Sequence, residues 1–384
     1  MDSGVKRDLA ILIGLALCFK VFTVLLTNSL HSFVDIYDYS YYFEHMVMIS
    51  NGKIPYVDFP FDYPTLAIVP MMTAFLVSGT NISTFVIVFQ LFMLICDALI
   101  IVGMYTIALL IWNNRKRASL AGLLYACSLP IAYFTITKFD AFPTMMLVWA
   151  VAYTLYNRPA EGYLMVVLGG MTKVFPFIAA PFLVIWNWKA GRDLKKECIV
   201  FGVLAISTLI LIVPFLVAGA GITDIFTVLT RGEVYPNTPA YLLHIYTGIS
   251  ADVFSVIALC LAIFAVGILI AVMWKGKRSP VLLIEVIAMA LIAVVYAAPL
   301  HSPQYLMWYM PFLCLLVGTD LVLIGLLVLS NIIAYIEFPL LFGSVWTNAK
   351  YINQGAGVVL FTIEFLVMAI LLIKIWWNYN RPHV

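Results

Sequence analysis

The chain has 384 residues, of which 64% are hydrophobic and only 10% are charged, and its mean hydropathy is +1.06. Soluble domains carry about 25% charged residues, so this composition excludes an ordinary soluble protein. The net charge of +2 indicates no particular partner, and nothing in the sequence predicts nucleic acid binding. The six cysteines fall inside apolar segments without a CxxC pair, so we interpret them as small buried hydrophobic residues, with no disulfide expected.

Apolar segments of roughly 20 residues recur along the chain, and a helix of that length crosses a bilayer core of about 30 Å. Basic residues beside membrane spans mark the cytoplasmic side. The basic clusters lie at 6–7, 115–117, 189–196 and 275–278. Placing these clusters inside predicts an all-α integral membrane protein with about twelve spans and both termini in the cytoplasm.

The expected spans follow one another without a clear internal repeat. They are 8–28, 83–112, 118–137, 139–157, 161–172, 174–189, 197–218, 252–274, 281–299, 303–318, 320–341 and 356–378. We expect the first of them to be a retained span rather than a removed signal peptide. Together they predict a single polytopic domain over residues 1–384, with a second large outer loop at 219–251.

The first outer loop, residues 29–80, is rich in acidic and aromatic side chains. Its segment 38–50 has the pattern of an amphipathic helix lying on the membrane, and Asn51-Gly52 has the turn chemistry that ends a helix. The residues expected to face lipid or the protein core are Tyr39, Tyr42, Phe43 and Met46. Segment 64–79 is also apolar, but a span there would place residues 115–117 outside. We therefore expect a second interfacial or dipping helix on the outer face.

Ionisable residues at membrane depth are costly and therefore point to a function or to a structural pair. Lys20 and Asp97 each fall near the middle of an expected span. We interpret them first as an ion pair that fixes helix register, and second as a functional pair. Three glutamates also lie within or near spans without an evident partner: Glu285, Glu337 and Glu364.

A second group of charged and polar residues converges on the outer face in the predicted topology. It comprises Asp38, Asp140, Lys173, Arg231, Glu233, His301 and Gln304. Lys173 lies between two short spans, where glycines and a proline permit an irregular backbone. Cations at this level can hold a lipid-linked phosphate leaving group while a carboxylate removes a proton from an incoming hydroxyl. Each residue by itself is more simply explained as a solvated loop residue.

Four short segments of the chain, taken in order, form a sequence pattern, which we call the series. In the first outer loop the series reads Asp38, Tyr42, Gly52, Pro55-Tyr56, Asp58-Phe59 and Asp62-Tyr63-Pro64. KFDAFP at 138–143, GGMTKVFPF at 169–177 and HSPQYLMW at 301–308 follow in order. This series resembles the GT-C superfamily of membrane glycosyltransferases, most closely glycosyltransferase family 87. The departures from that pattern are Thr65 where Pro is usual, Asp62 where Glu is usual, and Met46 where a small residue is common.

The resemblance implies an inverting transferase that moves a sugar, by analogy mannose, from a polyprenyl-phosphate carrier to a lipid-linked or glycan acceptor on the outer face. The family's base corresponds to Asp38, with Asp35 as the alternative and Asp140 as a further catalytic candidate. Donor-phosphate contacts are expected from Lys173, Arg231, Gln304 and His301. Substrate-loop contacts are expected from Tyr42, Tyr56, Asp58, Asp62, Tyr63 and Tyr305. Neither a metal nor a cofactor is expected, and membrane lipids are the other expected partners.

Three of these assignments have simple structural alternatives. Asp38 also suits the N-terminus of the amphipathic helix, because Asp accepts hydrogen bonds from the backbone N–H groups there. Asp140 can orient the acceptor or hold the nearby Lys138. A backbone contact at the Pro303 turn explains Gln304 equally well.

A multi-pass transporter or lipid-linked-sugar flippase is the alternative function, and a non-catalytic membrane scaffold is the third. A transporter places its binding groups near the midplane on broken helices, where Lys20 and Asp97 fall. A cavity lined by both of these residues and open to both sides favours transport. One outer cavity lined by Asp38, Lys173 and Gln304 favours the enzyme. No GxGxxG, Walker A or HExxH motif occurs, so nucleotide-sugar use and zinc hydrolysis have no support.

Overall fold

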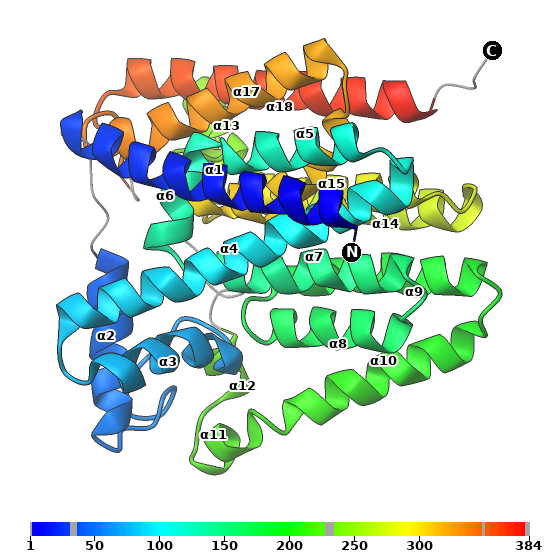
Figure 1. The fold of residues 1–384 in the computed structure, drawn as a ribbon. Helices are drawn as coiled ribbons and strands as arrows, with labels where there is room; N and C mark the ends of the chain where they lie inside the picture. The colour runs from blue at the N-terminus through cyan, green and yellow to red at the C-terminus, as the bar shows by residue number, and fades with distance from the viewer. Residues whose placement is uncertain (1, 31–36, 227–233, 348–349, 381–384) are drawn as a thin grey trace. The chain divides into compact units, whose positions relative to one another are not determined.

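The computed structural model describes residues 2–30, 37–226, 234–347 and 350–380, and the regular elements in these ranges are all helical (Figure 1). This confirms the predicted all-α class. Extended backbone pairs in these ranges only as isolated bridges, such as the one between Pro55 and Phe59. A helix satisfies its own backbone hydrogen bonds, which is the condition for crossing a bilayer.

Six helices in the described part of the chain are long and apolar enough to cross a membrane. They are α1 (Ser3–Ser29), α4 (Ile82–Trp112), α14 (Ala251–Lys275), α15 (Pro280–Ala297), α17 (Leu321–Tyr335) with η5 (Ile336–Leu340), and α18 (Gln354–Asn380). The consecutive helices α5 (Arg115–Ala126) and α6 (Leu129–Thr137) add a seventh if this pair, bent by 62°, is one span. All of them coincide with predicted spans, and they indicate a multi-pass membrane protein.

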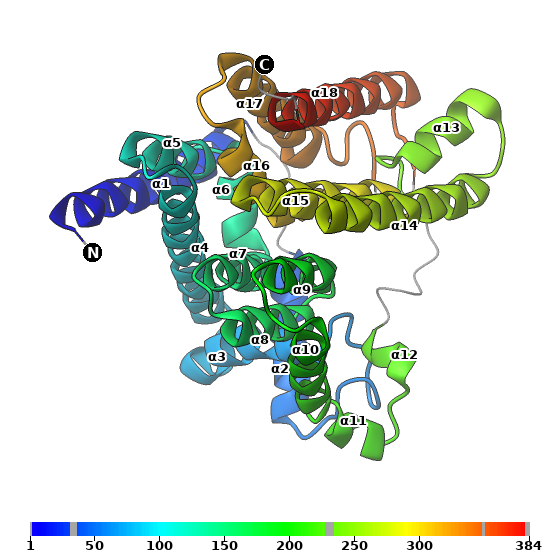
Figure 2. The same cartoon turned by 90° about the vertical axis from the view of Figure 1, so that its right-hand side faces the viewer.

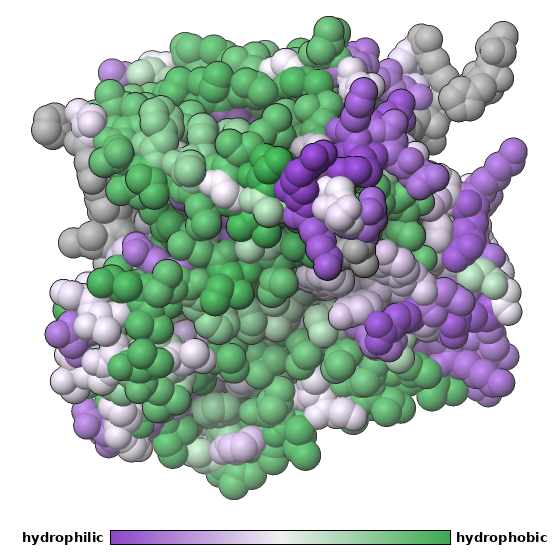
Figure 3. All heavy atoms as spheres, viewed as in Figure 1, coloured by the Kyte–Doolittle hydropathy of each residue, from purple (hydrophilic) through white to green (hydrophobic). Residues whose placement is uncertain are grey.

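The outer surfaces of the long helices are hydrophobic. Exposed residues include Ile11, Val21 and Leu25 on α1, and Leu91 and Ile95 on α4. Figure 3 shows a mainly hydrophobic surface over these helices, with hydrophilic side chains gathered at the end where α1 begins. Apolar side chains exposed along a whole helix suit lipid, whereas in water they would form a large patch that aggregates.

The remaining predicted spans coincide with shorter helices. These are α7 (Ala141–Leu155), α8 (Pro159–Gly170), α9 (Ala180–Lys189), α10 (Leu194–Leu209) and α16 (Leu306–Val317). Each has fewer than the roughly 20 residues that cross a bilayer core. The total of twelve spans therefore stays a prediction.

The chain forms two compact units, each made of segments far apart in the sequence. The first unit comprises Met1–Val34, Met104–Phe134 and Gly232–Val384, and the second comprises Asp35–Gly103 and Thr135–Arg231. In the first unit, α14 packs along α15 and α17 packs along α18 (Figure 2). In the second unit, α7, α8 and α9 lie side by side (Figure 1). The expected single polytopic domain over residues 1–384 stays a prediction.

The two expected helices of the first outer loop are present in the second unit. The first is α2 (Tyr37–Ser50), which buries Tyr39, Tyr42 and Met46 and ends before Gly52. Gly52 has φ +82°, a left-handed conformation that favours glycine. The second is the turn η1 (Thr65–Ala67) continued by α3 (Ile68–Ser78), which packs on α2. Their position at the membrane surface stays a prediction.

Candidate functional site

The first turn of α2 carries Asp38, the predicted base. Its Oδ2 atom accepts hydrogen bonds from Nζ of Lys138 at 2.8 Å and from Oη of Tyr42 at 3.0 Å. Tyr42 follows Asp38 by one helical turn, so α2 itself sets this second contact. The side chains of Lys138 and Asp38 are 6% and 15% exposed. Asp38 is thus an ion-paired and largely buried carboxylate. A solvated loop residue needs neither the ion pair nor the burial, and a residue that only caps a helix does not need them either.

The connector between α6 and α7, residues 138–140, contributes to two ion pairs. Lys138 pairs with Asp38, and Oδ1 of Asp140 accepts a hydrogen bond from Nζ of Lys173 at 2.7 Å. The side chains of Lys173 and Asp140 are 8% and 1% exposed. The suggestion from the sequence that Asp140 holds Lys138 stays a prediction. We call these four residues, two lysines and two carboxylates, the double ion-pair site.

Lys173 lies in an irregular stretch between α8 and the turn η2 (Phe175–Ala179), as the glycines and proline of this segment predicted. A Cβ atom at Gly170 would lie 2.4 Å from the ring of Phe177, so a larger residue there would displace this ring. The backbone N–H of Leu66 donates to the carbonyl oxygen of Met171 at 2.9 Å, which ties the first outer loop to this break. The break therefore holds Lys173 between two packed helices.

Aromatic rings lie against both ion pairs. Nζ of Lys173 is 5.0 Å from the ring centroid of Phe139 and 5.9 Å from that of Tyr63, distances at which a cation is attracted to a ring face. The ring of Tyr42, which donates to Asp38, contacts both of these rings, with centroids 5.9 and 6.3 Å apart. The two ion pairs thus share one aromatic wall, made of Tyr42, Tyr63 and Phe139.

Burial, reinforced by the charges of the site, keeps Tyr42 and Tyr63 protonated. Burial raises the pKa of Tyr42 and of Tyr63 well above the usual value, and the negative charges of Asp38 and Asp140 raise both pKa values further. Tyr42 therefore remains a hydrogen-bond donor to Asp38, and neither tyrosine can serve as a base near neutral pH. Because each ring is influenced by both carboxylates, the two ion pairs belong to one site.

Other predicted loop residues of the second unit support the site to different degrees. Tyr56 is buried and donates through Oη to the carbonyl oxygen of Tyr63 at 2.6 Å, so it positions the aromatic wall. Asp62 is half-buried next to Tyr63 in the chain. Asp58 is exposed and accepts a hydrogen bond from the backbone N–H of Ile54 at 2.7 Å, which closes a turn. Asp58 is therefore explained by local structure alone.

Three predicted residues, His301, Gln304 and Tyr305, belong to the first unit, between α15 and α16. Gln304 is half-buried in the turn η4 (Pro303–Tyr305), where its Oε1 atom accepts a hydrogen bond from the Ser302 hydroxyl. The ring of Tyr305 stacks on that of Trp308, with centroids 4.1 Å apart. The predicted contacts of these residues with the donor phosphate and substrate stay predictions.

Three residues singled out in the sequence fall outside the residues that the structure describes, namely Asp35, Arg231 and Glu233. The proposed pair at membrane depth divides between the units. Lys20 is buried in the first unit, and Asp97 is buried in the second, where it accepts a hydrogen bond from the Thr135 hydroxyl at 3.2 Å. Their pairing stays a prediction.

Sequence reasoning missed a polar cluster in the first unit. The side-chain N–H group of Asn237 donates to Oε1 of Glu337 at 2.8 Å and to the carbonyl oxygen of His301 at 3.0 Å. Glu364 lies near Glu337 and accepts a hydrogen bond from Oη of Tyr296 at 3.4 Å. The glutamates were visible as charges in apolar segments, but the loop residue Asn237 carried no such signal.

The pKa of His301 gives the first unit a pH-dependent stability. Burial lowers this pKa to about 4, against about 6.5 for an unperturbed histidine. Between these values the unfolded chain binds a proton that the folded chain excludes, so the stabilising effect is complete above pH 6.5 and is lost as the pH falls toward 4. At most about 3 kcal/mol is lost. We expect His301→Gln to reduce this acid-side fall in the Tm of the purified protein, and an unchanged pH profile would contradict the assignment.

Neither a family model nor a curated protein sequence matches this chain. The likeness to membrane glycosyltransferases therefore rests on four short segments of the sequence. A function has to be inferred from the chain's own residues, and above all from the double ion-pair site.

Proposed function

We propose that the chain is an inverting glycosyltransferase of the GT-C type, which moves a hexose, by resemblance mannose, from a polyprenyl-phosphate donor to a lipid-linked or glycan acceptor. The double ion-pair site carries the proposal. It gathers two lysines and two carboxylates from α2, the connector 138–140 and the break before η2. Burying ion pairs costs desolvation energy and is a weak route to stability, so four such groups in one site point to function.

The proposed reaction forms one bond and breaks one bond at the anomeric carbon of the donor sugar. The acceptor hydroxyl oxygen attacks this carbon on the face opposite the phosphate, and polyprenyl phosphate leaves with the electron pair of the broken bond. Asp38 takes the hydroxyl proton, which makes the oxygen a better nucleophile. Both bonds described for Asp38 go to Oδ2, so we assign the proton to Oδ1. The proton then passes to water.

Lys173 is the group that we assign to the leaving phosphate. The phosphate gains negative charge as the sugar bond breaks, so a fixed cation stabilises the transition state more than the ground state. Asp140 holds Nζ of Lys173 in place, and the donor phosphate would share this cation with it. Arg231 and Gln304 are further candidates. His301 has a lowered pKa, so near neutral pH it would contribute an N–H donor rather than a charge.

We further propose that the site faces the extracytoplasmic side of the membrane, in a chain of twelve spans with both termini in the cytoplasm. The basic clusters beside the expected spans support this orientation, because such clusters are retained on the cytoplasmic side. A donor built on a membrane lipid then reaches the site from the bilayer, and α2 and α3 would lie at the outer headgroup level.

The full-length chain, reconstituted in liposomes with a labelled polyprenyl-phosphate hexose and candidate acceptors, tests the proposal. We expect label to enter an acceptor product with inverted anomeric configuration, and only when the acceptor is present. A labelled nucleotide sugar supplied in place of the lipid donor should give no product. If folded protein transfers no label from any polyprenyl-phosphate hexose to any lipid-linked or glycan acceptor, the proposal is wrong.

The buried cluster around Glu337 and Glu364 favours the alternative, a multi-pass transporter or lipid-linked-sugar flippase. Ionisable groups buried in membrane helices often mark proton relays in pumps and transporters. In the same liposomes, a flippase would expose the labelled donor to a membrane-impermeant reagent on the opposite leaflet without forming product. Product formed without this movement supports the enzyme.

A further inference from the structure

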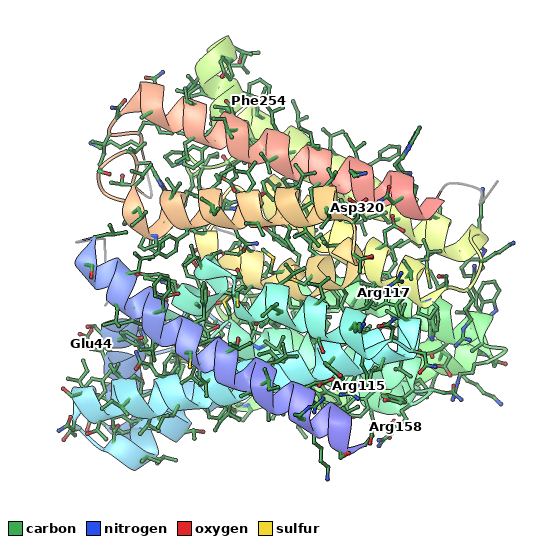
Figure 4. The ribbon with its side chains drawn as sticks, turned by 45° about the horizontal axis from the view of Figure 1, so that its top comes forward. Glu44, Arg115, Arg117, Arg158, Phe254 and Asp320 are labelled. Carbon is green, nitrogen blue, oxygen red and sulfur yellow. The ribbon has the colours of Figure 1, made fainter. Side chains whose placement is uncertain are left out.

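A groove in the first unit lies where α1 and α5 both begin. Its volume is about 680 Å³, within the range of sites that bind small ligands. Arg7, Arg115 and Lys116 line one end, and aliphatic side chains of both helices line the other. Figure 4 shows Arg115, the first residue of α5, beside the beginning of α1. The groove is therefore basic at one end and hydrophobic at the other.

The order of residues along each helix produces this polarity. On α1, Arg7, Ile11 and Leu15 follow one another at spacings of four, so they lie on one helix face. On α5, Lys116 is followed on the same face by Leu120. Both helices thus present a cation first and aliphatic side chains further along the span. Ile11 and Leu15 are 54% and 42% exposed, so the aliphatic end is open to the surroundings.

Close packing builds the floor of the groove. A Cβ atom at Gly122 would lie 2.8 Å from Cδ1 of Leu12, so α5 approaches α1 more closely than a larger residue allows without a shift. Arg115 donates through Nε and Nη2 to Oδ2 of Asp8 at 3.0 and 2.8 Å, and Tyr105 donates to the same oxygen at 2.7 Å. This network fixes Arg115 in place.

The charges of the groove do not cancel. Asp8 is the only carboxylate among its lining residues and faces three cations. Arg115 is already bound to Asp8, whereas Arg7 and Lys116 are exposed. Asp8 neutralises only part of the positive charge at the basic end of the groove. This end therefore attracts an anion.

We propose that this groove binds a phospholipid of the surrounding bilayer with an anionic headgroup. The headgroup phosphate lies between Arg7 and Lys116, and the acyl chains follow the aliphatic side chains along α1 toward the membrane interior. Basic pockets between membrane helices bind anionic headgroups in this way. A soluble anion would use only the basic end and leave Ile11 and Leu15 uncovered. The proposal is independent of the glycosyltransferase function.

Native mass spectrometry of the detergent-solubilised full-length chain, titrated with phosphatidylglycerol and phosphatidylcholine of matched acyl chains, tests this site. Two cations at about 1 kcal/mol each predict that Arg7→Gln/Lys116→Gln weakens phosphatidylglycerol binding by about 10- to 30-fold. The matched control is Lys275→Gln/Lys277→Gln, which removes two exposed cations, one at the last residue of α14 and one just beyond it, both outside the groove. We expect the control to bind phosphatidylglycerol as the unchanged chain does.

A second measurement uses the unchanged protein and needs no variant to fold. Raising the salt from about 0.1 to about 0.5 M should weaken binding of phosphatidylglycerol but not of phosphatidylcholine, because salt screens exposed charges. Equal binding of the two lipids would overturn the proposal, and so would an equal loss in the control variant. Displacement of phosphatidylglycerol by equimolar polyprenyl phosphate would show that the carrier lipid is the occupant and would overturn it too.

Discussion

Replacing Asp38 with Asn is expected to reduce sugar transfer by about 10²- to 10⁴-fold, the usual contribution of a general base. Asn keeps the shape of Asp and can still accept hydrogen bonds from Lys138 and Tyr42, but it cannot take the acceptor proton. Donor binding should change little, because the assigned phosphate cation is Lys173. The measurement is single-turnover transfer from the labelled donor, beside the affinity for the donor alone.

Asp38→Ser separates catalysis from helix stability. Loss of an Asp at a helix N-terminus costs about 1 kcal/mol, and Ser restores most of that contribution. A purely structural Asp38 would therefore be rescued by Ser, with transfer and Tm both close to those of the unchanged protein. A catalytic Asp38 would not be rescued. If Asp38→Ser kept substantial transfer activity, Asp35 and Asp140 would become the candidates for the base.

Lys173→Ala is expected to lower turnover by about 10²-fold or more, judged from the loss of single donors to a developing charge. This variant leaves Asp140, which is 1% exposed, without its ion-pair partner. Breaking a buried pair in this way costs about 3–5 kcal/mol, so instability could imitate a loss of catalysis. Lys173→Met/Asp140→Asn avoids this because it removes both charges together, and it should remain folded while turnover stays low.

The matched control is Lys53→Ala, which removes an exposed lysine of the same outer loop region. It should leave turnover unchanged, since a solvated surface charge contributes little. Near-normal turnover by Lys173→Met/Asp140→Asn in folded protein would refute the phosphate assignment. A raised Km for the donor with unchanged kcat would instead show that Lys173 binds the ground state and transition state equally.

Asp140 and Lys138 illustrate which features of the site could be predicted from the sequence. The motif KFDAFP drew attention to both residues, and their closeness in the chain suggested that they pair. In the structure each has a distant partner, since Lys138 and Asp38 are 100 residues apart and Asp140 and Lys173 are 33 apart. These two ion pairs join segments far apart in the sequence, which closeness in the chain does not reveal.

The polar cluster of the first unit also contains contacts between segments far apart in the sequence. Glu337 and Glu364 were visible in the sequence as isolated charges in apolar segments, and an isolated charge there needs a partner. Glu337 accepts a hydrogen bond from Asn237 and Glu364 accepts one from Tyr296, two neutral residues that no pattern singles out. The sequence around each glutamate shows that it needs a partner. Only the tertiary structure shows which residue that partner is.

The sequence by itself determined the helical class, the positions of the long apolar helices, the helix ending before Gly52 and the irregular stretch around Lys173. These features depend on local hydrophobicity, on glycine and proline conformations and on hydrogen bonds within one segment, all of which a continuous stretch of residues contains. Only the tertiary structure decided that Lys138 faces Asp38 and that Asp140 faces Lys173 on one aromatic wall. Such pairs form only when packing brings distant segments together, and no continuous stretch of residues determines which segments meet.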